Sequence, residues 1–184
     1  MSVAYRIRPL TPADEPALWE MLYYAIYVPP GGEPPSRSIL DAPEVARYVR
    51  GWGCPDDEGL GAELIDSDQI VGAAWLRRLT AEAPGYGYID DATPELSIAV
   101  APPSRGQGMG ARLLAELLAM AQARYATVSL SVSADNPALR LYCRLGFAVV
   151  RQRGGALIMR KQFAPPVPSP SDPVAPTPAS ATGG

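Results

Sequence analysis

The segment that most constrains the fold of this chain is a glycine-rich turn, Arg105 to Gly110, between an extended run and a helical run. The extended apolar run covers Glu95 to Val100, and the helical run covers Ala111 to Arg124. Alternating glycines allow a tight turn and let a ligand approach the backbone without meeting a Cβ atom. The first N–H groups of a helix lack intrahelical partners and the helix dipole favours negative charge there. The arrangement is therefore typical of a phosphate-binding site.

Three known types of phosphate-binding loop can be compared with this turn. A Walker-type loop ends in Gly-Lys-Ser/Thr, but Gly110 is followed by alanine and arginine, which makes that assignment weak. A dinucleotide-binding loop has the spacing Gly-x-Gly-x-x-Gly near the start of a domain, whereas the glycines here alternate and come late in the chain. The third pattern, Arg-x-x-Gly-x-Gly, fits Arg105, Gly108 and Gly110. A glycine-rich helix start that binds no ligand is the structural alternative.

A second motif follows at residues 136 to 147, with the sequence Asn-Pro-Ala-Leu-Arg-Leu-Tyr-Cys-Arg-Leu-Gly-Phe. Asn136 suits a helix N-cap, Pro137 the first helical position and Gly146 the helix end. Together with the Arg-x-x-Gly-x-Gly turn, this segment resembles the GCN5-related N-acetyltransferase (GNAT) superfamily, whose second motif reads Asn-x-x-Ala-x-x-x-Tyr-x-x-x-Gly-Phe. The alanine stands at 138 in this chain. The resemblance covers about residues 3 to 162.

The order of the expected elements agrees with the fold that this resemblance implies. That fold is of the α/β (α+β) class, with a mixed central sheet of about seven strands, about four flanking helices and a splay where the cofactor enters. Hydrophobic periodicity and turn signals predict strands at residues 3–8, 60–65, 70–79, 95–100, 127–133, 147–151 and 156–161, and helices at 11–27, 42–50, 111–124 and 136–145. The third helix is expected to bury a stripe made of Met109, Leu113, Leu117 and Met120.

The composition is consistent with one domain followed by a tail. The 184 residues are 47% hydrophobic, which is enough for one sizeable core. Residues 1 to 163 are expected to form the acetyltransferase domain. Residues 164 to 184 hold seven prolines and no aromatic residue, so they are expected to be a disordered or polyproline-like extension. An interaction module that docks through this tail is the alternative function for it.

Charge and residue types argue against several classes of function. A net charge of −3 gives no attraction to nucleic acid or to a membrane surface. The chain has no histidine, and Cys54 and Cys143 show no metal-like spacing, so we expect no metal and no disulfide framework. The first sixteen residues lack the apolar core of a signal peptide, and no run approaches membrane-spanning length. A cytoplasmic monomer or homodimer is the resulting expectation.

The resemblance assigns acetyl-coenzyme A to the two motifs and to the strand before them. It implies that the backbone of Ile98, Ala99 and Val100 pairs with the pantetheine arm. It also implies that the backbone of the whole turn holds the pyrophosphate, namely Arg105, Gly106, Gln107, Gly108, Met109 and Gly110. The side chain of Arg105 could reach a cofactor phosphate or form a surface ion pair. Asn136 could bond the pantetheine arm or simply cap its helix.

Tyr142 is the expected general acid, because in the family the tyrosine at this position points its hydroxyl at the cofactor sulfur. A phenol with a pKa of about 10 stays protonated at neutral pH and can donate its proton to the departing thiolate. The alternative is an aromatic side chain packed between helix and sheet.

Glu95 is the candidate base, acting directly or through a water, because an acceptor amine must lose a proton before or during attack. Alternation along the strand places Glu95, Ser97 and Ala99 on one face, which could line a cleft, and three apolar residues on the other, which should pack against a helix. A solvated carboxylate at the start of the strand is the alternative. Some family members instead carry the base on the next strand, where this chain has Ser131.

The implied activity is N-acetylation of a primary amine, on a small molecule or a protein, by direct attack on acetyl-coenzyme A in a ternary complex. The alternative is a non-catalytic acyl-coenzyme A binding protein or sensor on the same fold. Acceptor selection is expected to involve Tyr23, Tyr24 and Tyr27, the Pro/Gly loop 29–35, Trp52 and residues 86 to 91. The three tyrosines either form a wall of the ligand site or belong to the core. Five loop acids either attract a cationic amine or are simply solvated: Asp56, Asp57, Glu58, Asp90 and Asp91.

Overall fold

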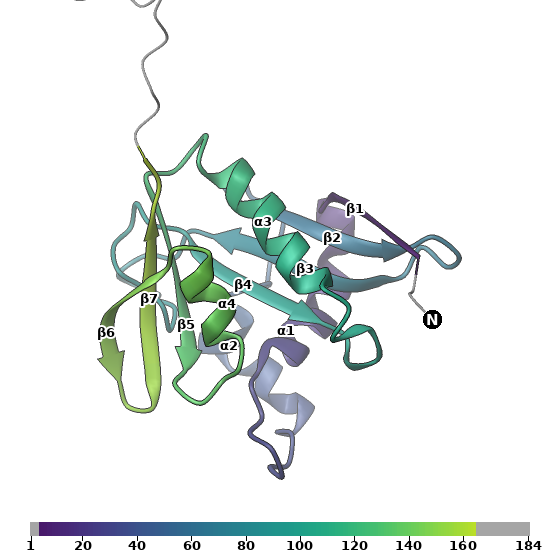
Figure 1. Ribbon diagram of the computed structural model, residues 1–184, viewed down its shortest axis with the longest axis horizontal. Helices are drawn as coiled ribbons and strands as arrows, with labels where there is room; N and C mark the ends of the chain where they lie inside the picture. The colour runs from purple at the N-terminus through teal and green to yellow at the C-terminus, as the bar shows by residue number, and fades with distance from the viewer. Residues whose placement is uncertain (1–3, 165–184) are drawn as a thin grey trace, which may run out of the picture.

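The computed structural model describes residues 4 to 164, which contain seven strands and four α-helices (Figure 1). The first half of the chain forms β1 (Tyr5–Pro9), α1 (Glu15–Ala25), α2 (Pro43–Ala46), β2 (Glu58–Leu64), β3 (Ile70–Arg77) and β4 (Glu95–Val100). The second half forms α3 (Met109–Ala121), β5 (Thr127–Ser133), α4 (Leu139–Arg144), β6 (Ala148–Arg153) and β7 (Ala156–Gln162). Short 3-10 helices lie at Pro12–Asp14, Arg37–Asp41 and Pro102–Ser104.

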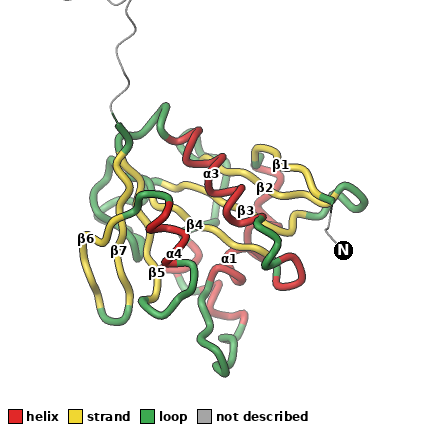
Figure 2. Tube along the Cα trace, in the orientation of Figure 1, coloured by secondary structure: helices red, strands yellow, loops and turns green. Residues whose placement is uncertain are grey.

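These elements confirm the predicted fold class. The connection 78–94 between β3 and β4 contains no helix or strand (Figure 2). The predicted tail, residues 164 to 184, lies outside the described residues except for Ala164. Within residues 4 to 164, no helix is both long enough and apolar enough to cross a membrane.

The seven strands form one mixed sheet in the order β1-β2-β3-β4-β5-β7-β6. Every neighbouring pair is antiparallel except β4 and β5, which are parallel and joined by the crossover helix α3. These two strands pair only at Glu95 and Ser129, near their first residues. Beyond that point they diverge, which Figure 1 shows as the angle between the two arrows. The predicted splay therefore lies between the carboxyl ends of β4 and β5.

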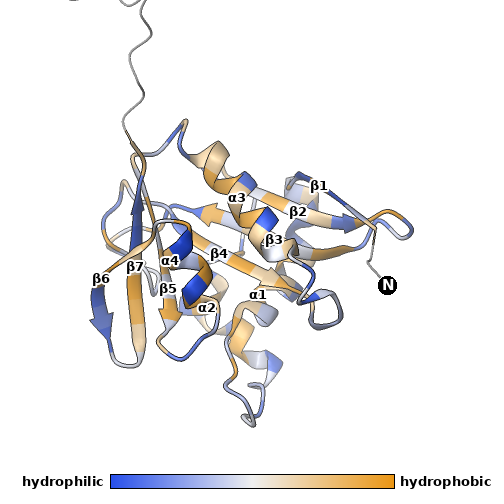
Figure 3. Cartoon of the chain, viewed as in Figure 1, coloured by the Kyte–Doolittle hydropathy of each residue, from blue (hydrophilic) through white to orange (hydrophobic). Residues whose placement is uncertain are grey.

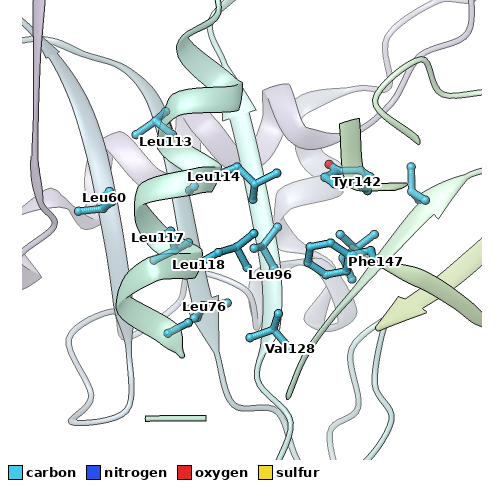
Figure 4. Close-up of a cluster of buried hydrophobic side chains, with 14 of the residues drawn as sticks. Leu60, Leu76, Leu96, Leu113, Leu114, Leu117, Leu118, Val128, Tyr142 and Phe147 are labelled. Atoms are coloured by element: carbon cyan, nitrogen blue, oxygen red, sulfur yellow. The ribbon is translucent and has the colours of Figure 1, made fainter. Parts of the chain in front are cut away.

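Two hydrophobic cores cover the two faces of the sheet. One packs α3 and α4 against strand residues such as Leu76, Leu96 and Val128, and Figure 4 shows the leucines of α3 pointing at them. The other packs α1 and the segment around α2 against Trp75 and Ala99. Figure 3 shows hydrophobic residues along the central strands, whereas the outer strand β6 is exposed throughout and hydrophilic in its second half.

The predicted stripe of α3 is correct at three positions and wrong at the fourth. Met109, Leu113 and Leu117 are fully buried, but Met120 is 37% exposed. The four-residue spacing continues from Leu117 to Ala121, which is buried and closes the stripe. Met120 lies at the edge of this face, so its apolar character misled the prediction.

Candidate active site

A cavity of about 1030 Å³ opens between β4 and β5, where the two strands diverge. Its walls come from the end of α1 and the loop after it, from β4, from β5 and from α4. Eight of the predicted site residues line it: Glu95, Ile98, Ala99, Val100, Arg105, Gly110, Asn136 and Tyr142. The other four belong to the same glycine-rich turn: Gly106, Gln107, Gly108 and Met109. The first three of these are exposed, and the side chain of Met109 is buried in the core.

The glycine-rich turn has the geometry that its sequence predicts. Gly106 and Gly108 have φ values of +76° and +78°, in the left-handed region that side chains rarely adopt. Gly108 is the N-cap of the 13-residue helix α3. A Cβ atom added to either glycine would meet nothing within 4 Å. The first N–H groups of α3 therefore begin at an open surface, as an anion site requires.

The side chain of Arg105 bonds to two backbone carbonyls. Its Nε donates to the oxygen of Val100 at 2.9 Å, and one terminal nitrogen donates to the oxygen of Tyr24 at 3.3 Å. The guanidinium thereby ties the end of β4 to the end of α1 at the rim of the cavity. The expected surface ion pair is not what this side chain forms. Contact with a cofactor phosphate would require it to leave at least one of these carbonyls.

The edge of β4 that faces β5 supports the pantetheine assignment. On its other edge, β4 pairs with β3 in a continuous register from Val100 to Glu95, without a bulge. Among the described residues, no strand pairs with the β5-facing edge after Glu95. The backbone of Ile98, Ala99 and Val100 therefore lines the cavity with an edge free to pair with an extended ligand.

The alternation predicted along β4 is also correct. Leu96 belongs to the core under α3, and Ile98 and Val100 pack against that core, whereas Ala99 belongs to the core on the opposite face. Because β3 and β4 pair without a bulge, Glu95 shares the face of Ala99.

Glu95 is a buried carboxyl and not a solvated one. The residue lines the cavity, yet it is only 4% exposed. Oε1 accepts hydrogen bonds from the Tyr48 hydroxyl at 2.6 Å and from the Gly87 N–H at 2.7 Å. Burial raises the pKa of Glu95 to about 7, and these two hydrogen bonds act in the opposite direction. A carboxyl with a pKa near neutrality is suited to take a proton in one step and release it in the next.

Tyr142 lines the same cavity from α4. Its ring meets Phe147 edge-on at a centroid distance of 6.0 Å, within the core that Figure 4 shows. Burial raises the pKa of Tyr142 to about 12, so its hydroxyl keeps its proton at neutral pH. No described residue accepts or donates a hydrogen bond at that hydroxyl. The packing alternative is therefore correct for the ring, and the acid role stays a prediction for the hydroxyl.

Asn136 forms a local turn ahead of α4. Its side-chain oxygen accepts a hydrogen bond from the Ala138 N–H at 2.9 Å. The predicted helix 136–145 is accordingly shorter, because α4 begins only at Leu139. The N-cap of α4 is Ala138, so Asn136 forms a turn before the helix and does not cap it. The residue also lines the cavity.

The acceptor residues expected from the sequence divide into two groups. Tyr23, Tyr24 and Tyr27 line the cavity, and the Tyr27 hydroxyl donates to the carbonyl of Asp135 at 3.2 Å, on the far side of the opening. Trp52 is a core residue, only 6% exposed, whose indole N–H bonds to the carbonyl of Thr11. Its predicted role in acceptor selection is wrong.

None of the five loop acids is among the described residues that line the cavity, and each has a partner. Asp56 pairs with Arg78 and Arg124, Asp57 with Arg77, and Glu58 with Arg124, while Asp90 accepts from the Ala92 N–H and Asp91 from the Ala81 N–H. Each carboxylate thus has a partner away from the cavity, which does not support attraction of an amine there. Asp90 and Asp91 are also exposed, in agreement with the solvation alternative.

Sequence reasoning missed Tyr48 and Gly85, and it placed Gly87 only within the acceptor region 86–91. Tyr48 lies in the turn after α2, which the sequence identified only as part of a short helix. Pro84-Gly85-Tyr86-Gly87 carries the usual composition of a tight loop, which was a usable signal for close backbone approach. Nothing local in the sequence indicated that both segments meet Glu95.

Comparisons with known proteins agree with this geometry. The model of the acetyltransferase (GNAT) family matches residues 19–147. A search of curated proteins found no match. Residues 4 to 164 contain no cluster of three or more histidine, cysteine, aspartate or glutamate side chains able to hold a metal ion.

Several solved structures share the fold. The ribosomal-protein-alanine N-acetyltransferase of Brucella melitensis is 28% identical, with a TM-score of 0.55 over 86% of this chain and 99% of that one. The PaiA N-acetyltransferase of Thermoplasma acidophilum, in complex with coenzyme A, is 21% identical, with a TM-score of 0.60 over 87% and 99%. YncA of Salmonella typhimurium, with its cofactor acetyl-coenzyme A, is 21% identical, with a TM-score of 0.58 over 96% and 99%.

Proposed function

Since the chain belongs to the acetyltransferase (GNAT) family, we propose that it transfers the acetyl group of acetyl-coenzyme A to a primary amine within a ternary complex. The observation that carries this proposal is the position of Glu95. A buried carboxyl with a pKa of about 7 lines a cavity that also reaches the glycine-rich turn. A mere coenzyme-binding protein has no need of a titrating group in that place.

The chain offers acetyl-coenzyme A two sets of backbone groups. The open N-terminus of α3, at Gly108, suits the pyrophosphate, and the free edge of β4 suits the extended pantetheine arm. The solved structures that bind coenzyme A or acetyl-coenzyme A on this fold support the same ligand. Bound there, the acetyl thioester supplies the acyl group, and no metal is needed for its transfer.

The two ionisable residues act on opposite sides of the reaction. Glu95 takes a proton from the amine, directly or through a water, as the new N–C bond forms. Tyr142 gives its proton to the sulfur as the C–S bond breaks. Cys143 is exposed and is not among the described residues that line the cavity, so direct transfer is favoured over a covalent enzyme intermediate.

The lining of the cavity favours an acceptor with an apolar or aromatic body. Among the described lining residues, Glu95 is the only carboxylate and Arg105 the only cation. The guanidinium of Arg105 already bonds two carbonyls, so no free cation awaits an acceptor carboxylate or phosphate. Six lining tyrosines supply aromatic surface instead: Tyr23, Tyr24, Tyr27, Tyr48, Tyr86 and Tyr142.

Calorimetry with acetyl-coenzyme A, followed by thiol release with a panel of amines in the same solution, tests the proposal. Binding followed by amine-dependent thiol release is the expected result. Binding without release from any amine would favour the coenzyme-binding alternative. Failure to bind acetyl-coenzyme A would overturn the proposed function.

A further inference from the structure

The carboxyl of Glu95 is held by two segments that lie far from it in the sequence. Besides its bond to Oε1 of Glu95, the oxygen of Tyr48 accepts a hydrogen bond from the Tyr86 N–H at 2.6 Å. An N–H can only donate, and a phenol carries one hydrogen, so the Tyr48 hydrogen must point at Oε1. The Gly87 N–H donates to the same oxygen.

These directions determine which carboxyl oxygen can carry a proton. The Tyr48 O–H and the Gly87 N–H already point at Oε1 of Glu95, so a hydrogen placed on that oxygen would be repelled by their hydrogens. Oε2 is buried and has no hydrogen-bond partner among the described residues. A proton bound to Glu95 therefore resides on Oε2.

Gly85 and Gly87 lie so close to the carboxyl that a side chain at either position is excluded. A Cβ atom on Gly85 would collide with Oε2 of Glu95 and would come within 2.6 Å of the Tyr48 hydroxyl oxygen. One on Gly87 would lie 2.8 Å from Oε1 and 2.6 Å from the carbonyl carbon of Leu130. The segment therefore occupies the narrow end of the gap between β4 and β5.

We propose that Tyr48 is a positioning residue of the proposed transferase, which together with the Gly87 N–H holds Oε1 of Glu95 so that a proton taken up by this carboxyl resides on Oε2. The inference rests on the proposed function for its chemical meaning. The geometry of the hydrogen bonds stands without it. Tyr48 acts through Glu95 and is not itself a proton carrier, since burial beside that carboxyl raises the pKa of its phenol far above neutrality.

Other ionisable groups near Glu95 do not supply the same control. Arg77 is its cross-strand neighbour on β3, but that guanidinium bonds to Asp57 and to the carbonyl of Gly51. On β5, its register partner is Ser129, which carries no charge. From the loop, Gly85 and Gly87 present backbone only. Tyr48 is thus the side chain whose removal changes the electrostatics of Glu95 most directly.

A pH titration of the full chain by NMR, with glutamate labelled at its carboxyl carbon, tests the inference without any substrate. The Glu95 signal is identified by its loss in Glu95→Gln. The hydrogen bond from Tyr48 favours the charged carboxyl, so Tyr48→Phe should move the midpoint upward from about 7 by about one pH unit. Tyr125→Phe is the matched control, because its hydroxyl bonds the carbonyl of Asp56 and its removal should leave the midpoint unchanged.

An unshifted or lowered midpoint in a folded Tyr48→Phe chain would overturn the inference. If that variant does not fold, Gly85→Ala provides the second test, since its methyl group would press on Oε2 and should also displace the Glu95 signal. Gly155→Ala, where a Cβ meets nothing within 4 Å, should not displace it. If Tyr48→Phe shifts the Glu95 midpoint while Glu95→Gln keeps full turnover, the positioning by Tyr48 stands and the proposed role of Glu95 as base is dismissed. If Tyr48→Phe leaves the midpoint unchanged while Glu95→Gln has no turnover, the base role stands and the positioning is dismissed.

Discussion

The two ends of the cavity are built in different ways. The end proposed for the cofactor consists of backbone: a turn with left-handed glycines at 106 and 108, the start of α3 and the free edge of β4. The base end consists of side chains from separate segments, with Tyr48 and Glu95 separated by 47 positions in the chain. A site made of backbone is formed by consecutive residues and can therefore be recognised in the sequence. A site made of side chains from distant segments is brought together only by folding.

The largest effect is expected at the cofactor end, from Gly108→Glu. The substitution strains a residue with φ of +78° and places a carboxylate where the phosphates would bind. Affinity for acetyl-coenzyme A, measured by calorimetry, should fall by at least about 100-fold. Gly154→Glu is the matched control, because Gly154 also has a positive φ and open space but lies in the β6–β7 turn. Equal losses in both variants would refute the phosphate assignment.

At the base end, Glu95→Gln should lower kcat by about 100- to 1000-fold while changing acetyl-coenzyme A affinity little. The amide keeps the size of the side chain but cannot take a proton. Steady-state thiol release measures kcat, and calorimetry measures affinity. Glu82→Gln is the control: Glu82 is exposed in the connection 78–94 between β3 and β4, and this variant should retain wild-type turnover. Retained turnover in Glu95→Gln would remove the base from the mechanism.

Tyr142→Phe should have a smaller effect on kcat, about 10- to 100-fold, because thiolate can depart without an acid at some cost. The ring packing against Phe147 is preserved, so stability and cofactor affinity should stay close to wild type. Comparing kcat with the calorimetric affinity separates the acid role of the hydroxyl from the packing role of the ring. Unchanged kcat would return Tyr142 to packing alone.

The pH dependence sharpens the comparison further. Only the ionised form of Glu95 can accept a proton, so kcat/KM should rise about tenfold per pH unit below about 7 and level off above it. Affinity for acetyl-coenzyme A depends on backbone groups that do not titrate in this range and should stay nearly constant. A flat rate profile across pH 6 to 8 would contradict the assignment of Glu95.

The smallest effect concerns the acceptor. Phenethylamine and phenylalanine differ by one carboxylate, for which the described lining offers no free cation. The amine should react with a kcat/KM about tenfold or more above that of the amino acid. Preference for the amino acid would show that Arg105 leaves its carbonyls to bind substrate.

The sequence predicted most of the fold and the geometry of the glycine-rich turn, because those features depend on neighbouring residues. Periodicity located the seven strands, and glycine spacing located the turn at 106 to 110. Glu95 was identified as a candidate, but its burial by Tyr48 and the glycine segment 85–87 was not predictable from local pattern. Trp52 was misassigned and the role of the loop acids stayed open for a related reason: an aromatic or acidic residue in a loop has the same local signature whether it faces substrate, core, solvent or arginine.

The burial of Glu95 also has a consequence for the stability of the chain. The folded protein holds the proton of this carboxyl more tightly than the unfolded chain does, because its pKa rises from 4.5 to about 7. The free energy of unfolding should therefore decrease by about 3 kcal/mol as pH rises through that interval. Above pH 7, Glu95→Gln should melt at a higher temperature than the wild type. Selection for thermal stability alone would thus favour losing the residue on which turnover is proposed to depend.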